Sequence, residues 1–348
     1  MINNNNKYMK RCLQLALNGA GNVAPNPMVG CVIVYNNIII GEGFHRKYGE
    51  AHAEVNAINS VKDKSLLKEA TAYVNLEPCS HFGKTPPCAD LLIQHQLKEV
   101  VIANVDINPL VANQGIGKLK AAGINVVTGV LEKEASYLNK RFFTFHKHKR
   151  PFIILKWAQT LDGFMDIERA YPGDNKKYWI TNDELKILVH KWRSEEASIM
   201  IGTNTALNDN PQLNVRLWEG KNPLRIILDE NLDLPHRLHV FDNSVPTIIF
   251  NSKLEESKGN TIFKKINFKE NVIKLILDYL YSINIQSVIV EGGRELLQSF
   301  IDAGIWDEAR ILTGNKSFNK GLPAPIINGN IVSFETINKD TVTIMSNF

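Results

Sequence analysis

The 348-residue chain lacks several features that would place it in a specialised structural class. No apolar run reaches the roughly 18 residues that cross a bilayer, so we expect no membrane-spanning segment and no membrane partner. Four cysteines are too few for a disulfide scaffold. The formal net charge is only +4, which neither demands nor excludes a nucleic-acid partner. With 44% hydrophobic and 22% charged residues, the composition is that of an ordinary globular protein.

A secretory signal is also lacking near the beginning of the chain. Basic residues precede a short apolar stretch, residues 12–17, but Gln14 interrupts it and no longer apolar region follows. The spacing of Met9, Leu13 and Leu17 instead predicts an amphipathic helix over about residues 7–19. We therefore expect a cytoplasmic protein with reduced thiols.

The length favours two domains, at about 100–200 residues each, and both halves alternate between helix and strand. The first half predicts helices near residues 7–19, 53–61, 89–95 and 115–122, and strands near 30–35, 38–43, 72–76, 100–105 and 125–128. The second half predicts strands near residues 151–157, 197–202, 224–229, 247–251 and 287–290, and helices near 181–194, 272–283 and 294–303. Thr181 is expected to cap the first of these helices. This alternation indicates α/β architecture, with three layers around one sheet in the first half.

A basic run separates the two halves. Residues 140–150 hold Lys, Arg and His without an acid, and Pro151 follows. Such a run is more often a solvated linker or helix end than a nucleic-acid patch. We therefore place the domains at residues 1–145 and 150–348 and expect no nucleic-acid partner.

The strongest chemical signal lies between residues 51 and 88. His52 and Glu54 stand at the start of one predicted helix, Cys79 follows a strand, and Cys88 precedes another helix. One imidazole and two thiolates are the zinc-ligand set of the nucleobase deaminases, in which a glutamate beside the histidine moves protons. Three protein ligands leave the fourth position open for water, and zinc lowers the pKa of that water to about 7. We predict that His52, Cys79 and Cys88 bind one Zn²⁺ and that Glu54 is catalytic.

The spacing of the cysteines leaves an alternative open. The usual deaminase signature has two residues between its cysteines, whereas eight residues, 80–87, stand between Cys79 and Cys88 here. This insertion contains His81 and Lys84 and is interpreted as a loop that contacts substrate. In a purely structural zinc site, His81 would be the fourth ligand and Glu54 would have no role.

Longer motifs resemble a known family. The segments 24–30 (APNPMVG), 52–54 (HAE) and 77–88 (EPCSHFGKTPPC) closely resemble the bifunctional riboflavin-biosynthesis deaminase/reductases, and the eight-residue spacer is a feature of that family. The resemblance covers nearly the whole chain. It implies hydrolytic deamination of 2,5-diamino-6-ribosylamino-4(3H)-pyrimidinone 5′-phosphate, followed by NADPH reduction of the ribosyl group to ribityl. It also implies a cytidine-deaminase-like first domain and a dihydrofolate-reductase-like second domain.

The resemblance assigns further residues to each site. In the deaminase half it implies contacts with the phosphorylated pyrimidine by Asn26, His45, His81, Lys84, Asp106 and Asn108, with Lys84 at the phosphate. In the reductase half it implies substrate contacts by Arg193, Leu213, Arg216 and Glu291. It implies cofactor contacts by Ala158, Trp179, Thr205, Asp209, Gly292, Gly293 and Arg294. Lys156 and Asp162 are candidates for the proton donor in the reduction.

Other functions stay open at this point. The chain could be another zinc deaminase, acting on free cytosine compounds or tRNA bases, with a non-catalytic binding domain in its second half. One half could also keep its fold and lose its activity. The resemblance further implies a homo-oligomer, a dimer or a tetramer, assembled through the reductase half.

Overall fold

The computed structural model describes residues 4–80, 86–107, 112–169 and 178–347. The chain divides into two compact units, residues 1–149 and 150–348, which are described separately below. None of the helices in the described part of the chain is long and apolar enough to cross a membrane.

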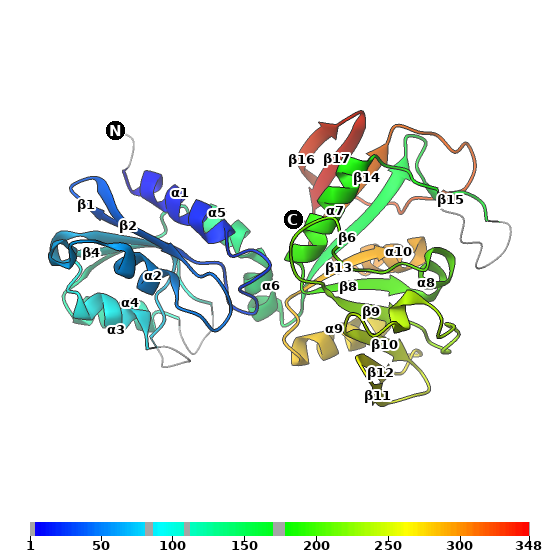
Figure 1. The fold of residues 1–348 in the computed structure, drawn as a ribbon, viewed down its shortest axis with the longest axis horizontal. Helices are drawn as coiled ribbons and strands as arrows, with labels where there is room; N and C mark the ends of the chain where they lie inside the picture. Colours follow the sequence, from blue (N-terminus) through cyan, green and yellow to red (C-terminus); the bar gives the residue numbers. More distant parts are fainter. Residues whose placement is uncertain (1–3, 81–85, 108–111, 170–177, 348) are drawn as a thin grey trace. The chain divides into compact units, whose positions relative to one another are not determined.

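The first unit is built around one five-stranded sheet (Figure 1). Its elements are α1 (Asn4–Leu17), β1 (Gly30–Tyr35), β2 (Ile38–Phe44), α2 (Ala53–Ser60), the 3₁₀ helix η1 (Lys64–Glu69), β3 (Thr71–Leu76), α3 (Cys88–Gln94), β4 (Glu99–Asn104), α4 (Gln114–Ala121), β5 (Asn125–Thr128), α5 (Glu132–Leu138) and α6 (Lys140–His148). The strand order is β2-β1-β3-β4-β5. Strands β3, β4 and β5 are parallel, whereas β1 is antiparallel to both of its neighbours.

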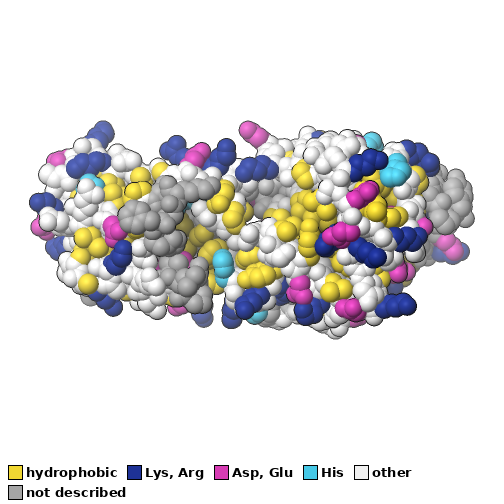
Figure 2. Space-filling model, turned by 90° about the horizontal axis from the view of Figure 1, so that it is seen from below, with side chains coloured by type: hydrophobic (Ala, Val, Ile, Leu, Met, Phe, Trp, Pro, Cys, Tyr) yellow, Lys and Arg dark blue, Asp and Glu magenta, His cyan; other side chains and the backbone are white. Residues whose placement is uncertain are grey.

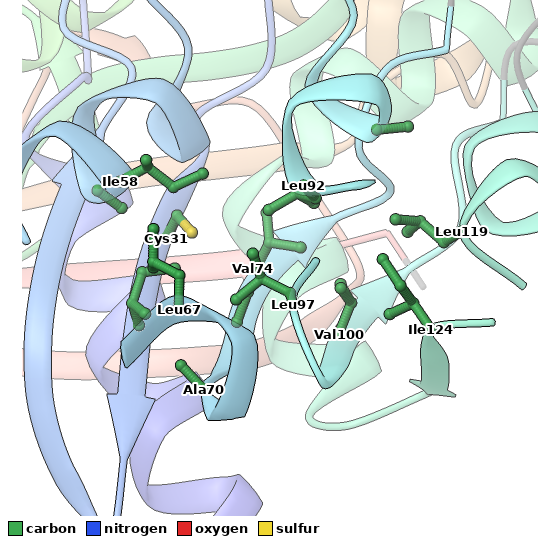
Figure 3. Packing of buried hydrophobic residues seen from close by; sticks show 14 of the residues in the cluster. Cys31, Ile58, Leu67, Ala70, Val74, Leu92, Leu97, Val100, Leu119 and Ile124 are labelled. Carbon is green, nitrogen blue, oxygen red and sulfur yellow. The ribbon is translucent and has the colours of Figure 1, made fainter. Parts of the chain in front are cut away.

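Helices cover both faces of this sheet, so the unit has three layers. Helices α2, α3 and α4 pack on one face through a buried cluster that includes Ile58, Val74, Leu92 and Leu119 (Figure 3). On the other face, α1 presents residues such as Met9, and α5 contributes the buried Ala135. Strands β3 and β4 are almost continuously buried because helices lie on both sides of them. The predicted three-layer α/β arrangement is therefore confirmed.

Of the two structures expected for the basic run between the halves, a solvated linker or a helix end, the structure shows a helix. Residues Lys140–His148 form the helix α6, which is part of the first unit. Phe142 and Phe145 are buried on this helix, and its basic side chains precede and follow them in the sequence. Because these two phenylalanines are three residues apart, they lie on one face of the helix, and this face is buried. The charge of the run did not indicate such a face.

The second unit contains a ten-stranded sheet and a small two-stranded one. Its elements are β6 (Phe152–Thr160), β7 (Phe164–Asp166), α7 (Asp183–Glu195), β8 (Ser198–Gly202), α8 (Thr203–Asp209), β9 (Leu224–Leu228), the 3₁₀ helix η2 (His239–Phe241), β10 (Thr247–Asn251), β11 (Glu256–Lys258), β12 (Thr261–Lys265), α9 (Val272–Ser282), β13 (Ser287–Gly292), α10 (Arg294–Asp302), β14 (Glu308–Gly314), β15 (Leu322–Pro323), β16 (Asn330–Ile337) and β17 (Asp340–Ser346). The order of the large sheet is β11-β12-β10-β9-β8-β13-β6-β14-β17-β16.

The centre of the large sheet is parallel, from β12 through to β14. Antiparallel strands complete its two edges, with β11 on one side and β17 and β16 on the other. One apolar core lies on the α7 face and a second lies on the face covered by α9 and α10. The parallel centre matters for function because ligands bind outside the carboxyl ends of such strands.

The cap of α7 corrects one sequence expectation. The helix begins at Asp183, and Asn182 is its N-cap, since its side-chain oxygen accepts the N–H of Leu185 at 2.9 Å. Thr181, which we expected to be the cap, lies one residue before it. Both residue types cap helices well, so composition could not decide between neighbouring positions.

Candidate active sites

The three residues predicted to bind zinc come from three separate elements of the first unit. His52 is the N-cap of α2, Cys79 follows the end of β3, and Cys88 is the first residue of α3. Their ligand atoms all lie within 4.8 Å of one another. The fold therefore brings together residues that are up to 36 positions apart in the chain.

The geometry and chemistry of this group fit a metal ion. The Nδ1 atom of His52 lies 3.3 Å from Sγ of Cys88 and 3.5 Å from Sγ of Cys79. The backbone N–H of Cys88 points at the Sγ of Cys79, at 3.3 Å. The hydrogen bond between the two thiol groups lowers the pKa of Cys79 and raises that of Cys88. One imidazole and two closely spaced sulfur atoms form a donor set suited to zinc.

Glu54 lies beside this group on the first turn of α2. Its side chain is buried, at 3% exposure. Burial and the nearby Cys79 together raise the pKa of Glu54 to about 7, although His52 opposes the shift. A buried carboxyl group next to a donor set of three described residues is arranged as an acid–base group for a metal-dependent reaction.

A chain of hydrogen bonds links two of the predicted substrate residues to the ligand group. The Nδ2 atom of Asn26 lies 3.2 Å from Nε2 of His45, and Nδ1 of His45 lies 3.1 Å from the carbonyl oxygen of Ala51. The ring of His45 also meets that of His52 edge-on, with centroids 5.3 Å apart. Because the carbonyl accepts from Nδ1, Nε2 is left to accept from Asn26.

The remaining predicted residues of this site divide into two groups. Asp106 follows β4, and its backbone N–H donates to Oε2 of Glu77 at 3.1 Å. His81, Lys84 and Asn108 lie outside the described residues.

The second unit contains a cavity of about 1090 Å³ at the carboxyl ends of its parallel strands. Residues that end or follow β8, β9 and β13 line it, including Gly202, Leu228 and Gly292. Ten of the eleven residues predicted to contact substrate or cofactor in the reductase contribute to the lining: Trp179, Arg193, Thr205, Asp209, Leu213, Arg216, Glu291, Gly292, Gly293 and Arg294. Ala158 does not belong to the lining and packs against the core on the α7 face.

A buried ion-pair group forms one wall of this cavity. Glu291 accepts two hydrogen bonds from Arg193, at 2.8 and 2.6 Å, and lies 3.5 Å from Nζ of Lys156. Burial alone would raise the pKa of Glu291, but the charges of Arg193 and Lys156 lower it to about 2. Burial lowers the pKa of Lys156, and Glu291 partly restores it. Glu291 is therefore a fixed anion that holds two cations in place.

A glycine turn and a basic residue stand at another wall. Gly292 has a φ of +145°, which requires glycine, and a Cβ on Gly293 would lie 3.2 Å from the hydroxyl of Thr205. Arg294 begins α10, and its buried Nε has no hydrogen-bond partner among the described residues. A close-approach glycine turn with an unpartnered guanidinium Nε at a helix start fits an anionic group such as a cofactor phosphate.

Two residues that sequence reasoning missed also belong to this cavity or support it. Arg169 lines the cavity and pairs with Asp209 at 3.0 Å. His190, buried at 3% exposure, accepts the backbone N–H of Arg216 at 3.3 Å through Nδ1. The spacing of three residues between His190 and Arg193 on one helix was the available signal, because such residues share a helix face.

Charged side chains of both signs are interspersed on the face that Figure 2 shows. Many lysines and arginines there lie near acidic side chains. This mixed pattern is typical of an ordinary protein surface.

Two family models match the chain. The cytidine and deoxycytidylate deaminase zinc-binding region matches residues 2–104, and the RibD C-terminal domain matches residues 151–318. The first match contains the His52, Cys79 and Cys88 group, and the second contains most of the cavity. The predicted deaminase-like and reductase-like α/β domains are thereby confirmed.

Curated relatives match over most of their length. The riboflavin biosynthesis protein RibD of Aquifex aeolicus is 41% identical over 321 residues, which cover 90% of this chain and 88% of the relative. RibD of Bacillus amyloliquefaciens is 41% identical over 310 residues, which cover 86% and 82%.

Solved structures agree with these matches. A diaminohydroxyphosphoribosylaminopyrimidine deaminase/5-amino-6-(5-phosphoribosylamino)uracil reductase from Thermotoga maritima has a TM-score of 0.89 and 38% identity, and the match covers 99% of this chain and 98% of that one. A structure of Acinetobacter baumannii RibD has a TM-score of 0.88 and 31% identity, with 99% of each chain covered. The chain therefore belongs to the RibD family of riboflavin biosynthesis proteins.

Proposed function

We propose that the chain is a bifunctional enzyme that carries out two consecutive reactions on one phosphorylated pyrimidine. The first unit deaminates 2,5-diamino-6-ribosylamino-4(3H)-pyrimidinone 5′-phosphate, and the second reduces the ribosyl group to ribityl with NADPH. The observation that carries this proposal is the His52, Cys79 and Cys88 group beside the buried Glu54. The 41% identity to a RibD protein across both units supports the pairing of the two activities.

In the deamination, His52, Cys79 and Cys88 would hold the zinc ion. Bound there, zinc acidifies water and so supplies a nucleophile near neutral pH. Glu54 takes a proton from water as the oxygen adds to the ring carbon that bears the 2-amino group, and it passes this proton to the ring nitrogen. Glu54 then moves the second proton to the amino group, the C–N bond breaks, ammonia leaves and a carbonyl forms.

The substrate in the first unit is bound by residues outside the ligand group. Asn26 and His45 are assigned to the base and sugar, and their mutual hydrogen bond supports a fixed arrangement. Asp106 is assigned to the ligand as well. His81, Asn108 and the phosphate-binding Lys84 complete the proposed site.

In the reduction, NADPH supplies the hydride that is added to the carbonyl of the ring-opened ribose. Arg216 and Arg193 are assigned to the substrate, with Leu213 and Glu291 beside them. Arg193 already donates its Nε and one Nη to Glu291, so the more exposed Arg216 is the better phosphate ligand.

The cofactor is assigned to the glycine turn and the residues around it. Arg294, with its unpartnered Nε, and the Gly292–Gly293 turn suit a phosphate group. Trp179, Thr205, Asp209 and Ala158 complete the proposed cofactor residues.

A two-stage assay on the zinc-loaded protein tests both activities. We expect ammonia release from the diaminopyrimidinone substrate without NADPH, and loss of absorbance at about 340 nm once NADPH is added. Glu54→Gln should lower deamination by about 10²–10⁴-fold while zinc stays bound and the deaminated intermediate is still reduced. Normal deamination by this variant, or loss of its zinc, would contradict the role of Glu54.

We further propose that the chain forms a homo-oligomer, a dimer or tetramer, through the β16 edge of the second unit. This outer strand exposes Ile331, Val332 and Phe334, at 67%, 48% and 61%. An apolar edge strand pairs readily with a second copy, and a two-fold axis lets two identical edges meet. Phe334→Lys should shift sedimentation to the monomer, whereas Ile262→Lys on β12 should not.

We also propose a cytoplasmic location, which the cysteines support. All four cysteines are free, and three of them are buried. Zinc-binding thiolates persist in a reducing compartment, so we place the enzyme in the cytoplasm. A functional fluorescent fusion that localises outside the cytoplasm would exclude this.

A further inference from the structure

The first unit buries an acid that the proposed chemistry does not use. Glu77 precedes Pro78 and Cys79 and is 4% exposed. Its Oε2 accepts the backbone N–H of Asp106 at 3.1 Å and that of Asn113 at 3.0 Å, and its Oε1 accepts that of Ile116 at 3.2 Å. Among the described residues, all of its side-chain hydrogen-bond donors are backbone groups.

These donors come from both ends of the connection between β4 and α4. Asp106 is the second residue after β4, whereas Asn113 is the N-cap of α4 and Ile116 lies in its first turn. One carboxylate therefore fixes where the chain leaves the sheet and where it enters the helix. A helix start favours an anion at this place, because its first N–H groups have no partner within the helix.

The start of α4 is also pressed against the segment that carries Cys79. A Cβ on Gly115 would lie only 2.1 Å from the carbonyl oxygen of Pro78, so this approach requires glycine. One turn further on, Nζ of Lys118 donates to the carbonyl oxygen of Ser80 at 2.9 Å. Contacts at Glu77, Pro78 and Ser80 thus hold the cysteine segment and the Asp106 connection together.

We propose that Glu77 is a positioning residue for deamination: it sets Asp106, a substrate-binding residue, in register with the metal-ligand segment. This inference rests on the proposed function of the first unit. Glu77 does not touch the reacting atoms and acts only through the backbone of Asp106 and α4. Its loss should therefore weaken substrate binding and leave the chemical step largely intact.

Glu77→Gln in the full-length, zinc-loaded protein tests this role. The amide keeps the shape of the side chain, but its NH₂ group must face at least one backbone N–H, and the charge is lost. We expect KM for deamination to rise by about tenfold or more, with kcat changed by less than about threefold and zinc content unchanged. The reductase activity of the same molecules, assayed with the deaminated intermediate, is the internal control.

Glu69→Gln on η1 is the matched variant, because it makes the same substitution at an exposed residue of the same unit. It should leave KM and kcat as they are. Glu77→Asp keeps the charge but shortens the side chain, so it should also raise KM. It also keeps the test valid if Glu77→Gln does not fold.

A double-mutant cycle with Asp106→Ala distinguishes positioning of Asp106 by Glu77 from a general loss of structure around the site. If Glu77 acts through Asp106, Glu77→Gln should add little to the KM of the Asp106→Ala variant. Fully additive effects, an unchanged KM in both Glu77 variants, or a fall in kcat together with loss of zinc would overturn the inference. Failure of the unmodified protein to release ammonia would instead overturn the proposed function.

Discussion

The two units each bury a glutamate beside their site, and they stabilise it in different ways. In the first unit, Glu77 accepts three backbone N–H groups. In the second, Glu291 is held by the side chains of Arg193 and Lys156. The backbone donors are neutral and are positioned by the fold, whereas the cations are themselves buried. We therefore expect the first unit to tolerate loss of the Glu77 charge far better than the second unit tolerates loss of the Glu291 charge.

The largest expected effect of this difference is on stability. Glu291→Gln leaves Arg193 and Lys156 buried without an anion, which typically costs about 3–5 kcal/mol. Glu77→Gln leaves only neutral donors and should cost about 1–3 kcal/mol. All five tryptophans, residues 157, 179, 192, 218 and 306, lie in the second unit, so their fluorescence in urea follows that unit alone.

The two variants should therefore behave differently in one experiment. Glu291→Gln should lower the midpoint of the tryptophan transition, and Glu77→Gln should leave it in place. If the Glu291→Gln variant were as stable as the unmodified protein, the expected difference between the two glutamates would be refuted.

Acid should next weaken the second unit in two separate pH ranges. Glu291 has a folded pKa of about 2, below its ordinary 4.5, because Arg193 and Lys156 outweigh its burial. Its contribution, roughly 3 kcal/mol, is present above pH 4.5 and is lost as pH falls towards 2. Burial and the neighbouring Arg193 and Arg216 lower the pKa of His190 to about 4 from 6.5. Its contribution is present above pH 6.5 and is lost as pH falls towards 4.

Tryptophan-detected urea unfolding at a series of pH values measures both ranges. The unfolded chain binds protons more tightly than the folded one at both groups, so stability must fall as pH falls. His190→Asn keeps an acceptor for Arg216 and should flatten the profile between pH 6.5 and 4 only. A profile that stays the same in this variant would show that His190 does not carry that range.

A smaller effect on stability is expected at Asn139 of the first unit, which makes its hydrogen bonds through a neutral amide group. Asn139 accepts the N–H of Met28 at 2.8 Å and donates to its carbonyl oxygen at 2.9 Å, which holds the segment that carries Asn26. Asn139→Ala should cost about 1–3 kcal/mol and raise KM for deamination. Thermal unfolding and steady-state kinetics check this, with Asn125→Ala at the exposed start of β5 as the matched change. Equal effects of the two substitutions would refute it.

The smallest effect is expected at an exposed ion pair. Lys274 and Asp278 are four residues apart on α9, and their side chains are 67% and 56% exposed. Lys274→Ala should change the free energy of unfolding by no more than about 0.5 kcal/mol, because solvent screens such pairs. A loss above 2 kcal/mol in the tryptophan-detected transition would mean that burial does not set the strength of ion pairs here.

Much of the first site could be predicted from the sequence because its chemistry is local. His52 and Glu54 are two positions apart at a helix start. The metal-binding role of the two cysteines could be predicted from their residue type and from the other ligand types nearby in the sequence. The buried central strands were equally predictable, since runs such as residues 100–105 are apolar without interruption.

The supporting residues were less accessible to sequence reasoning. Glu77 looked like part of a motif, yet its partners lie 29 to 39 positions away and are backbone groups. Backbone donors leave no trace in residue types, so no pattern could identify them. The expectation for the basic run at α6 rested on its charge, whereas its structure depends on the burial of Phe142 and Phe145.

The sequence by itself determined two α/β units and the donor set for a metal. Those features depend on apolar periodicity and on side-chain chemistry, which each short segment carries. Only the tertiary structure decided that the carboxyl ends of parallel strands bring these segments together. It also decided that one buried glutamate is satisfied by backbone groups and the other by two cations. Such pairings depend on distances between segments that are remote in the chain, and they exist only once both sheets have formed.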